Sequence, residues 1–291
     1  KASAGNFEKQ QIVSVTEDDL KTDTGLVRME NILLVELPAF HPKYRKWKKY
    51  GYKNAKEKEQ LRCVLDESTN GYCMYCYSRI RVDGKLFGDL EHAIEKKNSE
   101  KLIECIPNIG LTCRTCNQIF KKAGENKRKL PQVTIEKYES ESACTREKRK
   151  QCTVPCKALK KLQKEYSSLP GGEIILQPSG MKGGDSGEEL ALQYDVLKLE
   201  FQPACDYHAY SAREKVFIDR HIKRFRLNDP KYRTHQLYEF VRNIVDHNGK
   251  IPEYEYNNRI VAEFRKKLEN KSQEEVLKIC KKIFLATFLK E

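Results

Sequence analysis

The sequence predicts an α+β protein, in which mostly helical sequence precedes and follows a small cysteine-rich core. Three observations favour this fold class: two closely spaced cysteine pairs in the first half of the chain, few strand-like runs, and several segments in which apolar residues recur every three to four positions. Small sheets combined with separate helices produce such a pattern.

The 291 residues are long for one compact domain and short for three, so we expect one or two domains. Hydrophobic residues make up 39% of the chain, which is enough for a core, whereas 33% charged residues require a heavily charged surface. No run approaches the roughly 18–20 apolar residues of a membrane span, and no signal peptide is visible. A membrane protein and a secreted protein are therefore disfavoured, and we expect a cytoplasmic protein.

The chain divides into three regions. Residues 1–69 contain a polar arm and then a basic segment, 43–65, whose aromatic and apolar spacing predicts a helix. Residues 70–169 contain the paired cysteines and a basic, partly helical extension. Residues 170–291 begin with a linker, since the first eighteen positions hold six glycines, and continue as mostly helical sequence.

The third region contains one segment typical of a strand, Tyr194–Phe201, in which apolar residues partly alternate. Three helices are predicted after it, over residues 211–227, 234–247 and 273–289. Aromatic and aliphatic residues at three- to four-residue spacing in these helices predict packing faces and not ligand sites.

The formal net charge of +13 is concentrated in two segments. Residues 41–62 hold nine Lys and Arg against two Glu, and residues 146–164 hold eight against one Glu. A solvated helix face would explain either run alone. Two runs that flank one candidate site favour a polyanionic partner, because each neutralised phosphate releases condensed counterions. We therefore expect a nucleic acid as partner, with DNA favoured over RNA.

Eleven cysteines, an odd number, cannot all pair within the chain. Without a secretory signal, reduced thiols and metal sites are expected in place of a disulfide framework. The pairs Cys73-x-x-Cys76 and Cys113-x-x-Cys116, 36 residues apart, have the spacing that directs two thiolates to one ion, and four sulfurs satisfy tetrahedral Zn²⁺. A redox dithiol would need only one pair. Because no coordination position is left for water, this zinc would be structural.

A group of polar residues lies between the cysteine pairs and directly after the second pair. Asp89 and Glu91 alternate along an extended run that ends at His92, and Asn117 follows the last cysteine. A lone histidine is usually structural, and a lone asparagine carries no information. Here a zinc ion would hold together the segments that carry them, so we expect imidazole, carboxylate and amide groups in one place.

These residues resemble the HNH endonuclease family. The resemblance lies in the run from Asp89 to His92, in the run from Asn108 through the second cysteine pair to Asn117 and Lys121, and in the cysteine pairs themselves. It implies a zinc-stabilised ββα-metal core within residues 70–169, with strand, loop, strand and helix around one catalytic Mg²⁺ or Mn²⁺. It also implies an enzyme that hydrolyses phosphodiester bonds.

A wider resemblance to the HNH nuclease subunits of Septu-type and retron-associated antiphage systems covers roughly residues 43–245. It depends on the basic segment before the first cysteine pair, on the Glu-His-x-x-x-Lys run that ends at Lys96, and on a block from Ile175 to Asn228. It implies the effector nuclease of a prokaryotic defence system, acting with an ATPase partner subunit. One departure is Glu95, where those relatives usually have proline.

Phosphodiester hydrolysis requires an activated water, a counter-charge for the transition state and help for the leaving oxygen. Neutral imidazole can accept a proton from water near pH 7, so His92 is the candidate general base. Hard divalent cations prefer oxygen ligands, so Glu91 and Asn117 are the ligand candidates and Asp89 is an alternative. The resemblance implies that Asn108 ties the loop between the strands and orients His92.

Three further questions stay open in the sequence. Phosphate contact is assigned to Lys96, Lys121 and Lys122, although exposed helix lysines as often serve solubility alone. A second zinc site would need Cys152-x-x-x-Cys156 to meet Cys205-x-x-His208, with Cys144 nearby in sequence. The alternative function is a zinc-dependent module that binds nucleic acid without cutting it.

Overall fold

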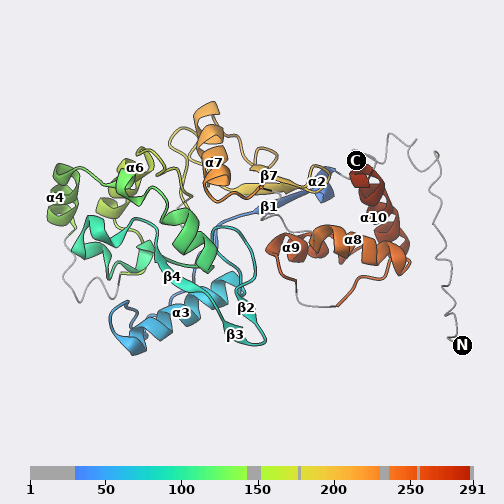
Figure 1. Cartoon of the computed structure of the whole chain (residues 1–291), viewed down its shortest axis with the longest axis horizontal. Coiled ribbons are helices and arrows are strands. Elements are labelled where there is room, and N and C mark those ends of the chain that lie inside the picture. Colours follow the sequence, from blue (N-terminus) through green and yellow to red (C-terminus); the bar gives the residue numbers. More distant parts are fainter. Residues whose placement is uncertain (1–29, 143–151, 176–177, 230–235, 254–255, 289–291) are drawn as a thin grey trace, which may run out of the picture.

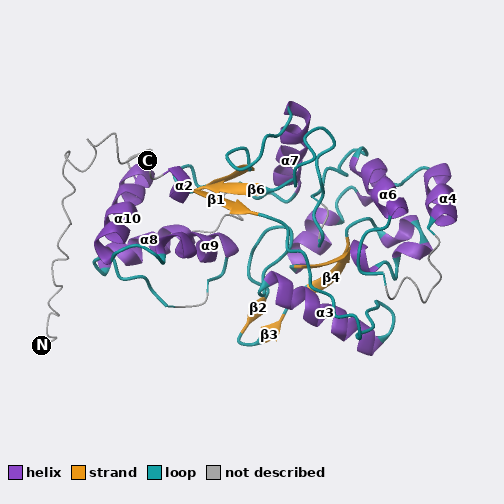
Figure 2. Cartoon of the chain, turned by 180° about the vertical axis from the view of Figure 1, so that it is seen from behind, coloured by secondary structure: helices purple, strands orange, loops and turns teal. Residues whose placement is uncertain are grey.

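The computed structural model describes residues 30–142, 152–175, 178–229, 236–253 and 256–288. A three-stranded sheet lies between two helical groups, as Figure 1 shows from one side and Figure 2 from the other. Helices α4 and α6 lie at one end, and α8, α9 and α10 lie at the other. The mixture of helices and small sheets confirms the α+β class.

The elements have the following bounds. The α-helices are α2 (Glu30–Leu33), α3 (Ala55–Thr69), α4 (Gln132–Glu141), α6 (Lys157–Ser167), α7 (Ala212–Arg224), α8 (Gln236–Asp246), α9 (Arg259–Leu268) and α10 (Gln273–Phe288). The strands are β1 (Leu34–Leu37), β2 (Arg81–Val82), β3 (Lys85–Leu86), β4 (Asp89–His92), β5 (Ile109–Thr112), β6 (Leu192–Asp195) and β7 (Glu200–Pro203). Short helical turns are η2 (Lys96–Asn98), η3 (Glu100–Leu102), η4 (Ile106–Asn108), the π-helical η5 (Thr115–Lys121) and η6 (Glu125–Arg128).

The three-stranded sheet has the order β1-β6-β7 and is antiparallel throughout. Val35 lies opposite Tyr194, and Tyr194 lies opposite Phe201. Val35 and Leu37 are buried, so the apolar face of β1 belongs to the core. The sheet thereby joins the first of the three expected regions to the third.

The strand predicted over residues 194–201 is wrong, because this segment is a hairpin. β6 ends at Asp195, whose Oδ1 accepts hydrogen bonds from the amides of Leu197 and Lys198, both at 3.0 Å. Leu199 then adopts a left-handed backbone, with φ 56°, before β7 begins. An aspartate that caps its own turn outweighs the apolar alternation on which the strand prediction depended.

The basic helix of the first region is shorter than predicted and begins at Ala55. Asn54 is its N-cap, and the side-chain oxygen of Asn54 accepts a hydrogen bond from the amide of Glu57 at 3.1 Å. The aromatic residues before Asn54 have helical spacing but share no face, since Trp47 is 80% exposed and Tyr50 is 1% exposed. The predicted helix over residues 43–54 is therefore wrong, and this segment is a loop.

The three helices predicted in the third region correspond to α7, α8 and α10, and α9 is an additional helix. Their apolar stripes are buried, with Phe240 of α8 packed edge-on against Phe264 of α9 at a centroid distance of 6.2 Å. The spacing therefore reported packing faces, as predicted. None of the helices in the described ranges combines the length and the apolar character that a membrane crossing requires.

Strands β4 and β5 form the antiparallel pair that carries the polar residues of the candidate site. Glu91 lies opposite Gly110, and His92 lies opposite Ile109. Helix α3 packs against β5 through a face on which Leu61 is fully buried, and η5 follows β5 after two residues. The paired strands β4 and β5 and the short helix η5 thus form one structural unit and also follow one another in the sequence.

A loop of small residues closes around the N-terminus of α7. The carboxylate of Glu214 accepts hydrogen bonds from the amides of Asp185 and Ser186 at 3.0 Å and from the amide of Ser211 at 2.9 Å. Burial opposes its ionisation, but these donors outweigh that effect and lower the pKa of Glu214 from 4.5 to about 2.

Glu214→Gln is therefore expected to lower the melting temperature by several degrees at pH 7. The depressed pKa means that the carboxylate stabilises the fold above pH 4.5 and loses this contribution as the pH falls toward 2. The difference between wild type and variant, measured by thermal melts at pH 7, 5, 4 and 3, should shrink over that window. A constant difference would show that the charge of Glu214 is not what matters.

Candidate metal centre

The four cysteines of the two pairs come together, as the sequence predicts. The sulfur atoms of Cys73, Cys76, Cys113 and Cys116 all lie within 4.8 Å of one another, and the Sγ atoms of Cys76 and Cys113 are 3.8 Å apart. Within the described ranges, no other group of three or more His, Cys, Asp or Glu side chains has the spacing of an ion site. This cluster could hold a structural metal ion such as zinc.

The surroundings of the sulfurs favour thiolates bound to a cation. The amides of Tyr75 and Cys113 point at the sulfur of Cys73, at 3.4 and 3.2 Å, and the amide of Cys116 points at the sulfur of Cys113 at 3.4 Å. Cys73 is fully buried, and burial raises the pKa of its thiol. A divalent cation would reverse that effect, because a coordinating thiol is deprotonated.

The cluster connects the turn after α3 to the junction between β5 and η5. Cys73 and Cys76 lie in that turn, and the amide of Met74 between them donates to the carbonyl of Leu111 at 3.0 Å. Cys113 and Cys116 lie at the end of β5 and within η5. A metal ion held by all four sulfurs would therefore fix the orientation of η5 relative to the strands.

One face of β4 carries the two carboxylates toward η5. Asp89 Oδ2 lies 3.5 Å from the side-chain nitrogen of Asn117, and both residues are half-buried. Glu91 is buried, with its Oε2 accepting from the Tyr75 hydroxyl at 2.8 Å and its Oε1 at 3.2 Å from Lys121 Nζ. The structure thus brings Asp89 and Asn117 together, whereas the carboxylate of Glu91, on the same strand, contacts Tyr75 and Lys121.

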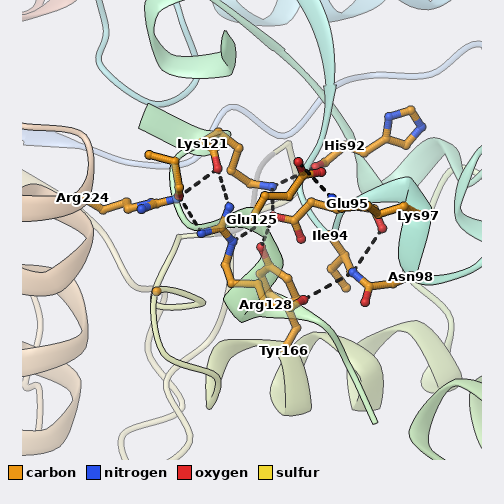
Figure 3. Close-up of polar contacts among 12 residues, drawn as sticks. His92, Ile94, Glu95, Lys97, Asn98, Lys121, Glu125, Arg128, Tyr166 and Arg224 are labelled. Atoms are coloured by element: carbon orange, nitrogen blue, oxygen red, sulfur yellow. Dashed lines mark hydrogen bonds and ion pairs between the residues drawn. The ribbon is translucent and has the colours of Figure 1, made fainter. Parts of the chain in front are cut away.

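His92 lies on the opposite face of β4. Its Nε2 donates to the carbonyl oxygen of Ile103 at 3.0 Å, and the ring of Tyr52 packs against it at a centroid distance of 4.6 Å. Figure 3 shows the imidazole directed away from Glu95 and Lys121. The expectation that the imidazole lies in one place with the carboxylate and amide groups is therefore wrong, because successive residues of a strand face opposite sides. Burial lowers the pKa of His92 to about 4, so the ring is neutral at pH 7. Because the carbonyl only accepts, Nδ1 carries the lone pair.

Asn108 closes the loop between the two strands. This fully buried amide donates to the carbonyl of Ile94 and accepts from the amide of Ile94, both at 2.9 Å. The carbonyl of Asn108 also accepts from the amide of Ala93 at 2.8 Å. The two residues that follow His92 are therefore fixed by one side chain and its own backbone, which holds the end of β4 in place.

The three lysines assigned to phosphate contact lie in different environments. Lys96 and Lys122 are exposed, and Lys96 lies over the ring of Tyr52 at 4.9 Å. Lys121 is only 3% exposed and forms ion pairs with Glu91 and Glu95. The assignment of Lys121 to a surface phosphate contact is therefore wrong, because its ammonium group forms buried ion pairs.

Glu95 is the centre of a buried ion-pair network that the sequence did not reveal (Figure 3). Its Oε1 accepts from Lys121 Nζ at 3.0 Å, from Arg128 Nε at 2.8 Å and from the Tyr166 hydroxyl at 3.0 Å. Burial opposes ionisation of Glu95, but the charges of Lys121 and Arg128 outweigh it and lower its pKa. The network joins the loop after β4 to η5, η6 and α6.

The residues of the possible second zinc site do not gather. His208 lies between Glu36 and Glu188, with ring nitrogens 2.8 and 3.3 Å from their carboxylates. Cys205 is exposed, and the thiol of Cys152 donates to a backbone carbonyl. Cys144 lies outside the described residues. Those members that the structure describes therefore form no shared site.

No protein-family model, no curated protein and no solved structure matches this chain.

Proposed function

We propose that this chain is a metal-dependent endonuclease of the HNH type, which hydrolyses phosphodiester bonds of nucleic acid, with DNA favoured. One observation carries the proposal: an antiparallel strand pair is followed by a short helix next to the four-cysteine cluster, with Asp89 beside Asn117 and with Glu91 and His92 at the end of the first strand. Binding alone would not require this combination.

The donors on the η5 face suit a hard divalent cation. The carboxylates of Asp89 and Glu91 and the side-chain oxygen of Asn117 would hold Mg²⁺ or Mn²⁺, which prefer oxygen ligands. Such an ion would stabilise the charge that develops on the phosphate and on the leaving oxygen.

His92 would act as the general base from the other face of β4. Its hydrogen bond to the Ile103 carbonyl fixes the ring, and its neutral Nδ1 can accept a proton from water. His92 is the last residue of β4 and marks the C-terminal end of the strand. Asn108 would keep that end in position through its two hydrogen bonds with Ile94.

His92→Ala is expected to lower the rate of Mg²⁺-dependent nicking of supercoiled plasmid by about 10²- to 10⁴-fold, the usual contribution of a general base. Zinc content should change little, because the cysteine cluster is untouched. Loss of the buried ring and of its hydrogen bond to Ile103 should lower the melting temperature, but the protein should stay folded at the assay temperature. His247→Ala, which removes an exposed histidine, is the matched control. Nicking by His92→Ala at the wild-type rate would remove His92 from the mechanism.

A second candidate function is a zinc-dependent module that grips nucleic acid without cutting it. The position of Lys121 favours it, because an internal ammonium 3.2 Å from Glu91 already supplies that carboxylate with a positive charge. The plasmid assay separates the two. A nuclease nicks with Mg²⁺ or Mn²⁺ and stops when the metal is omitted, whereas a binding module retards DNA in a gel with or without metal and leaves the plasmid intact.

The resemblance to antiphage nuclease subunits extends the proposal to a cellular setting. We infer a cytoplasmic effector nuclease that works with an ATPase subunit in a prokaryotic defence complex. Size-exclusion chromatography of the isolated chain and a pull-down from its native operon would test this. Recovery of the chain alone, with no co-purifying ATPase, would contradict it.

A further inference from the structure

The single tryptophan of the chain lies in an unusual position for so large an apolar side chain. Trp47 is 80% exposed, the highest value among the large exposed hydrophobic residues of the described ranges. An indole is normally buried or placed at an interface, because its large apolar surface is unfavourable in water. This exposure points to a partner that covers the ring.

The turn that presents Trp47 is held by specific contacts. The amide of Arg45 donates to the Tyr50 hydroxyl at 2.9 Å, and the amide of Lys48 donates to the carbonyl of Arg45 at 3.1 Å. Tyr50 is buried, and its ring meets that of Tyr44 edge-on at 5.2 Å. Trp47 therefore projects from a turn that is fixed at both ends, which lowers the entropy that binding would cost.

The side chains next to Trp47 in the sequence are mostly basic. No Asp or Glu occurs between residues 41 and 54, and the exposed indole is surrounded in sequence by five cationic side chains: Lys43, Arg45, Lys46, Lys48 and Lys49. A purely apolar partner would have to bury these charges. A partner with flat rings and regularly spaced negative charges fits both features at once.

The same loop continues to the candidate site. Tyr52 follows Tyr50 after one residue and packs against the His92 ring at 4.6 Å. The amides of Tyr52 and Lys53 both donate to the carboxylate of Glu104, at 2.7 and 2.9 Å, which anchors the loop next to β4. Lys58 and Lys96 lie over the Tyr52 ring at 4.9 Å. A strand bound along this loop would be led toward His92.

We propose that residues 43–53 form a binding surface for single-stranded nucleic acid, in which Trp47 stacks on an unpaired base and the neighbouring lysines and Arg45 contact phosphates. This inference deepens the proposed function, on which it rests for its choice of nucleic acid, by assigning unpaired strands as the substrate class. Stacking requires exposed base faces, which a continuous duplex does not offer. Base–aromatic stacking typically strengthens binding roughly 5- to 150-fold.

Intrinsic fluorescence tests this directly, because every emitted signal in the tryptophan channel comes from Trp47. His92→Ala protein without added Mg²⁺ is titrated with a 12-nucleotide single-stranded DNA, with the matching duplex, and with phosphatidylserine vesicles. Single strands should quench the emission, and the duplex should quench it far less. A shift of the emission to shorter wavelength with vesicles, but no response to single strands, would assign the surface to lipid and overturn the proposal.

Trp47→Ala should weaken binding of a labelled single strand roughly 5- to 150-fold in anisotropy measurements. Phe87→Ala, which removes another exposed aromatic ring at 61% exposure, should not. Equal affinity of Trp47→Ala and wild type would overturn the inference even if the enzyme nicks plasmid. Conversely, strong quenching by single strands in a chain that never nicks would sustain the surface and reject the nuclease.

Discussion

Replacing Cys113 with serine is expected to release zinc and unfold the core around β4, β5 and η5. Structural zinc sites bind with apparent free energies of about 10–16 kcal/mol at pH 7, whereas a whole domain is stabilised by only about 5–15 kcal/mol. Cys113 holds the junction between β5 and η5, so the loss should extend to Asn117 as well. Elemental analysis and circular dichroism melts measure the two effects.

Cys63→Ser is the matched control for this experiment, because Cys63 is exposed on α3 and outside the cluster. It should retain close to one zinc per chain and the wild-type melting temperature. If Cys113→Ser kept both its zinc and its melting temperature, the cluster would not be a structural metal site.

Lys121→Met is expected to have the second largest effect on stability. Methionine fills a similar volume but leaves the carboxylates of Glu91 and Glu95 buried without the ammonium that neutralises them. Breaking a buried ion pair from one side costs about 3–5 kcal/mol, which corresponds to a fall of roughly 5–15 °C in melting temperature. Lys122→Met, on the adjacent exposed lysine, should change it by less than about 2 °C, as surface substitutions usually do.

A double-mutant cycle can assign the cause of this loss. If unpaired charge is responsible, adding Glu91→Gln to Lys121→Met should recover part of the lost stability, because the amide needs no counter-charge. Strictly additive losses in denaturant titrations would mean that Lys121 contributes through packing alone. The network would then be incidental to the position of η5.

The cysteine core was predictable because its signal is local and chemically demanding. Two residues between cysteines allow both sulfurs to bind the same ion, and one tetrahedral ion can bind two such pairs. The helices α7, α8 and α10 were predictable for a similar reason, since an apolar stripe at helical spacing has few other interpretations. The predicted start of the helix that became α3 was wrong, because the spacing of aromatic residues does not show which rings are buried. Trp47, for example, is exposed.

The ion-pair network could not be predicted, because its members are dispersed. Glu95, Arg128 and Tyr166 are separated by dozens of residues, and no spacing rule relates them. The sequence likewise did not predict that the side chain of Lys121 is buried, because a lysine on a short helix is ordinarily exposed.

The three-stranded sheet imposes an order of events during synthesis. Strand β1 cannot pair until β6 has been synthesised, because Val35 lies opposite Tyr194, about 160 residues later in the chain. At translation rates of about 5–20 residues per second, the first strand leaves the ribosome roughly 8–32 s before its partner exists. During that interval its leucine and valine side chains are accessible to chaperones, and the sheet can close only after β7, which ends at Pro203, has been made.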